Sequence, residues 1–79
     1  MKYTTFDAQK WNLTTFKKIG YDREKKNLYI YFYTGNILEF INVNEKDVFQ
    51  LVISTEKERY IQEMKSTYDF IHHPRSSLA

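Results

Sequence analysis

Three tyrosines alternate along one short run of the chain, and a group of basic side chains comes shortly before them. Aromatic rings offer surfaces on which nucleic-acid bases stack, and nearby cations bind the phosphate backbone. This combination predicts a non-enzymatic domain that binds RNA or single-stranded DNA. The candidate binding residues are Tyr29, Tyr31, Tyr33, Lys17, Lys18 and Arg23.

Two other interpretations of these residues stay open. Tyrosine also serves protein interfaces, so the same aromatic face could bind a protein or a second copy of this chain. The rings could instead pack across strands or beneath residues 1–12. For the basic residues, a solvated turn around Arg23 needs no function, and Asp22 and Glu24 interrupt the positive charge. Stacking contributes ~1–3 kcal/mol per base, so two rings predict weak, salt-sensitive binding.

The sequence shows no pattern typical of an enzyme or a metal centre. Its acidic residues form no paired arrangement for acid–base catalysis, and it contains no glycine-rich phosphate loop or nucleophile elbow. His72 and His73 are adjacent and have no cysteine or suitably placed carboxylate nearby, which fits no common ligand spacing. We therefore expect no catalytic residue, no metal and no cofactor.

Length and composition favour one small soluble domain. The 79 residues suffice for a single core, and 14 of them are aromatic, including seven Tyr. Cysteine is absent and no apolar run is long enough to cross a membrane, so we expect a cytoplasmic protein without a membrane partner. The net charge is only +2, but residues 1–26 hold seven basic and three acidic side chains, so the positive charge is local.

Three strands are expected in the first half of the chain. Residues 28–33 and 37–43 are rich in β-branched and aromatic side chains, and residues 13–21 form a weaker third candidate. A two-residue loop between the first two would make both hairpin faces apolar. We favour a three-residue loop, residues 33–35 with Gly35 in the left-handed region, because it gives one consistent core face and places Tyr29 and Tyr31 on the other. The opposite, core face then carries Leu28, Ile30, Phe32, Leu38 and Phe40.

Two helices are expected in the second half. Asn44 can cap a short helix in which Val48, Leu51 and Val52 recur at helical spacing. A second helix begins near Thr55, which forms a capping-box pattern with Glu58, and it ends before Pro74. The apolar stripe of this second helix consists of Ile61, Met64, Tyr68 and Ile71. Two further rings are assigned to the core: Phe16 and Phe49.

The central part of the chain resembles a known family, the KTSC domain. This domain is named for its occurrence at the C-terminus of some lysyl-tRNA synthetases, and it also occurs alone as a small bacterial or phage protein. The family pattern fits residues 16–44 without a gap, although its Y-x-Y is here Leu38-Glu39-Phe40 and its V-P proline is here Asn44. The resemblance implies a compact sheet-plus-helix domain of unestablished function, with RNA binding suggested for the family. It rests on Phe16-Lys17-Lys18-Ile19-Gly20-Tyr21-Asp22, Leu28-x-Ile30-x-Phe32, Gly35, Leu38-x-Phe40 and Val43.

Together these patterns predict an α+β fold. A three-stranded antiparallel meander is covered on one face by a short helix and a longer C-terminal helix. Residues 1–71 are expected to form the single domain, and residues 72–79 a flexible tail.

Overall fold

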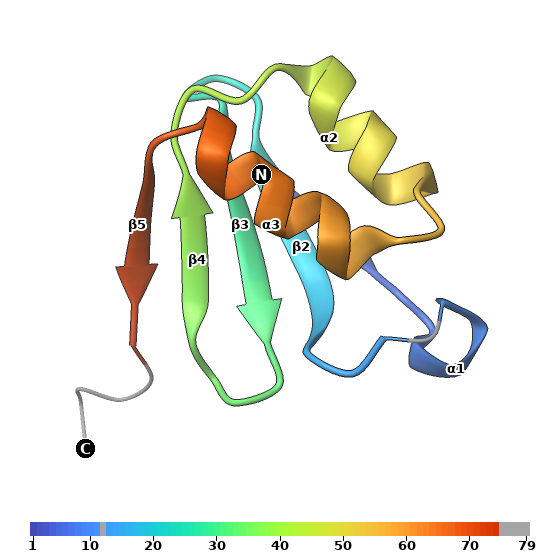
Figure 1. Ribbon diagram of the computed structural model, residues 1–79. Helices are drawn as coiled ribbons and strands as arrows, with labels where there is room; N and C mark the ends of the chain where they lie inside the picture. The colour runs from blue at the N-terminus through green and yellow to red at the C-terminus, as the bar shows by residue number, and fades with distance from the viewer. Residues whose placement is uncertain (12, 75–79) are drawn as a thin grey trace.

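Five antiparallel strands form one sheet in the order β1-β2-β3-β4-β5. The computed structural model describes residues 1–11 and 13–74. Figure 1 shows α2 and α3 packed on the same side of the sheet. The strands are β1 (Lys2–Thr5), β2 (Phe16–Asp22), β3 (Asn27–Phe32), β4 (Ile37–Phe40) and β5 (Phe70–His73). The helices are α1 (Ala8–Trp11), α2 (Glu45–Ile53) and α3 (Lys57–Thr67).

The α+β class and the antiparallel central strands are as expected, but a sheet of three strands was too small. The predicted meander corresponds to β2, β3 and β4, and an additional strand pairs with each of its edges. No helix among the described residues is long and apolar enough to span a membrane.

The fifth strand corrects two predictions about the C-terminal segment. Helix α3 ends at Thr67, so Ile71 is not part of its apolar stripe. Instead Ile71 pairs with Glu39, and His72 and His73 pair with β4, although a tail was expected from residue 72. Phe70 is aromatic and Ile71 is β-branched, so both suit a strand as well as the apolar face of a helix. This segment forms a strand because the edge of β4 is free to pair with it. Residues 75–79 of the predicted tail lie outside the described residues.

The register of the β3–β4 hairpin confirms the three-residue loop. Leu28 pairs with Phe40 and Ile30 pairs with Leu38, so the two residue numbers of each cross-strand pair add up to an even value. An even sum requires an odd number of residues in the loop. The Phe32 amide donates to the Asn36 carbonyl over 3.0 Å, which closes the loop around residues 33–35. Gly35 has a φ of 98°, where a side chain would be strained. The apolar hairpin face is therefore turned toward the helices.

The core lies between this face and the two longer helices. Phe49 was assigned to it wrongly, because this ring is 60% exposed on α2. Helix α2 turns Val48 and Leu51 inward, and a residue next to Val48 in sequence is rotated away from that stripe. The most deeply buried side chains include Phe16, Leu28, Ile30, Phe40, Val43 and Leu51.

The capping box predicted for α3 does not form. Thr55 precedes the N-cap position, which Glu56 occupies, and the Glu56 side chain makes no capping hydrogen bond. Glu58 instead accepts hydrogen bonds from the backbone amides of Thr14 and Thr15, both over 2.8 Å, and from their hydroxyls. Burial raises the pKa of Glu58, but these bonds outweigh it and leave the pKa below its usual value. Glu58 therefore joins α3 to the segment that leads into β2.

The ammonium group of Lys57 is buried where α2 ends. Lys57 is 1% exposed, and its Nζ donates to the carbonyl oxygens of Leu51 (3.1 Å), Val52 and Ser54 (2.9 Å). The last carbonyls of a helix have no partner within the helix and carry partial negative charge. A lysine from α3 therefore closes the C-terminal end of α2.

Two aromatic rings lie against the same ammonium group. Lys57 Nζ is 3.7 Å from the centroid of the Trp11 ring and 4.8 Å from that of Phe6. Burial lowers the pKa of Lys57, whereas the carbonyl oxygens and ring faces favour its charged form. The contact attaches α1 and the residue after β1 to the helical layer.

Replacing Lys57 by methionine is expected to lower the free energy of unfolding by about 3 kcal/mol, because buried carbonyls lose their donor while the apolar stem remains. Urea denaturation measures the change. The control is Lys46→Met on the exposed surface of α2, which should stay within about 0.5 kcal/mol of the wild type. Equal effects of the two substitutions would contradict a stabilising role for the buried ammonium group.

Candidate nucleic-acid interface

The side of the sheet opposite α2 and α3 is covered by neither helix (Figure 1). We call it the open face. Because side chains alternate along a strand and cross-strand partners share a side, the pairing defines its members. They are Tyr3, Thr5, Lys18, Gly20, Asp22, Asn27, Tyr29, Tyr31, Ile37, Glu39, Ile71 and His73.

Lys18 lies against two tyrosine rings on the open face. Its Nζ is 4.7 Å from the centroid of Tyr31, its cross-strand partner, and 5.2 Å from that of Tyr3. The two ring centroids are 6.0 Å apart, with the planes tilted by 53°. Burial, followed by a hydrogen bond with Tyr3, raises the pKa of Tyr31 to about 12, so its phenol stays neutral at physiological pH. The cluster combines a cation with one exposed ring, Tyr3, and one half-buried ring, Tyr31.

Tyr3 was not among the predicted site residues. It belongs to β1, which sequence reasoning left without an assigned element, and it is 56% exposed. Its partner across the strands is Gly20. A Cβ on Gly20 would lie 2.9 Å and 3.0 Å from two carbons of the Tyr3 ring, so the ring occupies the space that a side chain would fill. A glycine inside a strand pattern was the available signal for such a close approach.

Glu39 binds three side chains at the centre of the open face. Its Oε2 accepts from Asn27 Nδ2 over 2.7 Å and from the Tyr29 hydroxyl over 3.2 Å, and its Oε1 is 2.8 Å from His73 Nε2. The bond with His73 is the main cause that lowers the pKa of Glu39, and it outweighs the opposing effect of burial. With 13% of its side chain exposed, this carboxylate fixes Tyr29 and the end of β5.

The structure brings only some of the six predicted residues together. Tyr29, Tyr31 and Lys18 share the open face. Lys17 is exposed and next to Lys18 in the chain, at an irregularity in β2 that interrupts the alternation of sides. Tyr33 is outside the strand, in the turn after β3, and is 50% exposed. Arg23 points elsewhere: its Nε is 3.3 Å from Glu45 at the start of α2, on the helical side.

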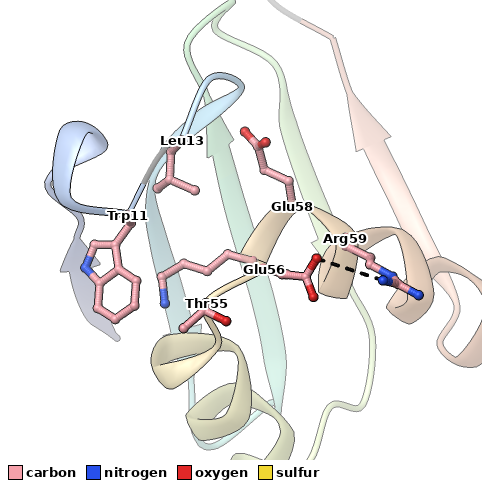
Figure 2. Close-up of a pocket in the computed structure, with 7 residues that line it drawn as sticks. Trp11, Leu13, Thr55, Glu56, Glu58 and Arg59 are labelled. Carbon is pink, nitrogen blue, oxygen red and sulfur yellow. Dashed lines mark ion pairs between the residues drawn. The ribbon is translucent and has the colours of Figure 1, made fainter.

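A hollow on the helical side adjoins the buried lysine (Figure 2). Its volume is about 220 Å³. The ion pair drawn across it joins Glu56 and Arg59 over 3.9 Å, and both side chains are exposed. Lys57, the buried cation among the residues that line the hollow, already donates to backbone carbonyls. Seven residues line the hollow: Trp11, Leu13, Thr55, Glu56, Lys57, Glu58 and Arg59.

Comparison with protein families matches residues 14–68 to the KTSC domain. The chain belongs to the KTSC domain family. The match confirms the resemblance seen in the sequence and extends it through both longer helices. It does not include β1, α1 or β5, so Tyr3 and His73 of the open face lie outside the matched region of this KTSC domain. A search among curated proteins finds no match.

Gly20→Ala is expected to displace the Tyr3 ring and to destabilise this KTSC domain by about 1–3 kcal/mol, because the new methyl group would overlap the ring. Urea denaturation of four proteins forms a double-mutant cycle: wild type, Gly20→Ala, Tyr3→Ala and the double variant. The cost of Gly20→Ala should fall when Tyr3 is alanine. An unchanged cost would mean that Tyr3 does not occupy the space above Gly20.

Glu39→Gln should destabilise the domain in a pH-dependent manner. The pKa of Glu39 is lower in the folded state than its ordinary value of 4.5, so its charged form stabilises the fold above that pH. The difference in unfolding free energy between wild type and variant should be larger just above pH 4.5 than below it. It should shrink as the pH falls below 4.5 and through the lower folded-state pKa.

Urea denaturation at a series of pH values measures this difference. The matched control is Glu24→Gln, in the exposed turn between β2 and β3. A gap between wild type and Glu39→Gln that widens as the pH falls below 4.5 would contradict the assigned bonding of Glu39.

Proposed function

We propose that this domain binds single-stranded RNA or DNA across the open face of its sheet. The observation that carries the proposal is Lys18 lying against the rings of Tyr3 and Tyr31 on a side of the sheet that neither α2 nor α3 covers. Sheet platforms for single strands combine such rings, on which bases stack, with cations that track the phosphates.

The arrangement of charge supports an anionic ligand. Lys17 and Lys18 follow each other in β2, and Lys17 is exposed. Two acidic groups lie on the same face. The side chain of Glu39 is largely covered and bound by Asn27, Tyr29 and His73. Asp22, at the end of β2, accepts from the backbone amides of the following turn. Repulsion of a phosphate backbone by Glu39 is therefore reduced, and the charge that lies against the rings is that of Lys18.

The rings favour bases over an apolar protein surface. Tyr29 and Tyr31 are half-buried in the sheet, and their positions are fixed by Glu39 and Lys18. Fixed rings bind a flat partner without losing further rotamer freedom. Stacking tolerates any base, so the proposed binding depends little on sequence. Association with a protein through this face is the alternative, and it makes a different prediction about salt.

Fluorescence anisotropy with a labelled single-stranded oligonucleotide tests the proposal. Two phosphate contacts, from Lys17 and Lys18, predict an affinity about sevenfold lower at about 200 mM than at about 50 mM salt. Tyr31→Leu keeps apolar bulk but removes a stacking face, so it should weaken binding about tenfold. Lys18→Ala should also weaken binding and flatten the salt dependence.

Lys46→Ala is the matched control, because Lys46 is an exposed lysine on α2, on the other side of the molecule. It should leave affinity within about twofold of the wild type at fixed salt, apart from the general effect of net charge. Absence of binding at about 50 mM salt would overturn the proposal, as would binding that Tyr31→Leu leaves unchanged.

A further inference from the structure

Strand β5 forms one edge of the described sheet (Figure 1), and all four of its residues are exposed. Phe70 is 43% and Ile71 is 49% exposed. Natural edge strands usually carry a lysine, a proline or a bulge that prevents pairing with another chain. Residues 70–73 contain no lysine, proline or acidic residue. Among the described residues no strand pairs with this outer edge of β5, so it can accept a further strand.

The hydrogen-bond pattern shows which backbone groups are free at this edge. The Ile41 amide donates to the Asp69 carbonyl over 2.9 Å. In an antiparallel ladder, residues alternate between facing the neighbouring strand and facing away from it. Asp69, Ile71 and His73 therefore direct their amide and carbonyl groups toward β4. Phe70 and His72 direct theirs outward, where no strand of the described residues lies.

We infer that this protein forms a symmetric dimer in which β5 pairs antiparallel with β5 of a second copy. Backbone hydrogen bonds between the two copies form only in a register that places outward-facing residues of one copy opposite outward-facing residues of the other. With Ile71 on the two-fold axis, Phe70 of each copy pairs with His72 of the other, and all the outward amide and carbonyl groups of both residues are used. Pro74 has no amide hydrogen, so a register shifted toward it forms fewer bonds.

The side chains of β5 are complementary to themselves in this register. Asp69 of one copy lies opposite His73 of the other, and the symmetry repeats this pair at the other end. Ile71 meets its own copy between them, where the two chains come closest. His73 already contacts Glu39 through Nε2, which leaves its other ring nitrogen available for the second copy. Hydrogen-bonded and apolar cross-strand pairs both stabilise a sheet.

The other edge of the sheet lacks this complementarity. The Phe6 amide donates to the Lys17 carbonyl, so Tyr3 and Thr5 face outward on β1. Pairing about Thr4 would place Lys2 opposite Phe6 of a second copy, with no acidic partner. The observations therefore favour β5 over β1.

The dimer would extend the open face into one surface. Antiparallel pairing about an axis perpendicular to the sheet keeps the helices of both copies on one side and both open faces on the other. The inference does not depend on nucleic-acid binding, because it rests only on the free edge of β5.

Sedimentation velocity of the full chain, without nucleic acid, tests the dimer. Between about 10 µM and about 1 mM the wild type should shift from monomer to dimer, since short edge contacts give weak association. Ile71→Lys places like charges on the two-fold axis and should raise the dissociation constant at least about tenfold. Ile53→Lys is the matched control, because Ile53 is also 49% exposed but lies on α2.

Amide hydrogen exchange gives a second readout that a different interface would not produce. The amides of Phe70 and His72 should become protected as the protein concentration rises, whereas those of Ile71 and His73 should be protected already. A wild type that remains monomeric at about 1 mM would overturn the inference. A dimer that Ile53→Lys disrupts and Ile71→Lys does not would overturn it too.

Discussion

The register of the β3–β4 hairpin is the constraint on which the rest of the molecule depends. The three-residue loop fixes which residues of the two strands lie opposite each other, so Leu28 and Ile30 share a face with Leu38 and Phe40. A shift by one residue would reverse every side chain of one strand relative to the other. The helices can bury one face only because it is uniformly apolar. The opposite face is left to Tyr29, Tyr31 and Glu39.

A buried charge organises the side of the molecule that the hairpin turns toward the helices. Lys57 joins three elements: it begins α3, it satisfies the last carbonyls of α2, and it lies against the ring of Trp11, the last residue of α1. Glu58, the next residue, binds the segment before β2. These two adjacent side chains of opposite charge therefore connect the helical layer to the part of the chain that precedes β2. Each has several polar or aromatic partners, and these offset the loss of its hydration.

The two edge strands give this KTSC domain features outside the region that the family match covers. Strand β1 adds the Tyr3 ring to the cluster around Lys18, and Gly20 leaves room for it. Strand β5 adds His73, which holds the carboxylate of Glu39. The matched region supplies the core and the two central tyrosines, and the flanking strands complete the proposed binding surface. The proposed dimer uses a different part of β5, its outer edge, so both contacts can exist together.

Local patterns in the sequence were enough to predict the α+β class, the family, the three central strands and the two faces of their hairpin. These features depend on short-range rules: alternation along a strand, the loop length that Gly35 permits, and apolar spacing in a helix. Only the tertiary structure decided the positions of Tyr3, Arg23, Phe49, Glu58 and the segment after Thr67. Apart from Phe49, which helical spacing beside Val48 turns outward, each was determined by a partner distant in sequence: Gly20 for Tyr3, Glu45 for Arg23, the amides of Thr14 and Thr15 for Glu58, and the edge of β4 for Phe70 and Ile71. A local pattern carries no information about such partners, so a capping box and a longer helix were predicted where long-range hydrogen bonds formed instead.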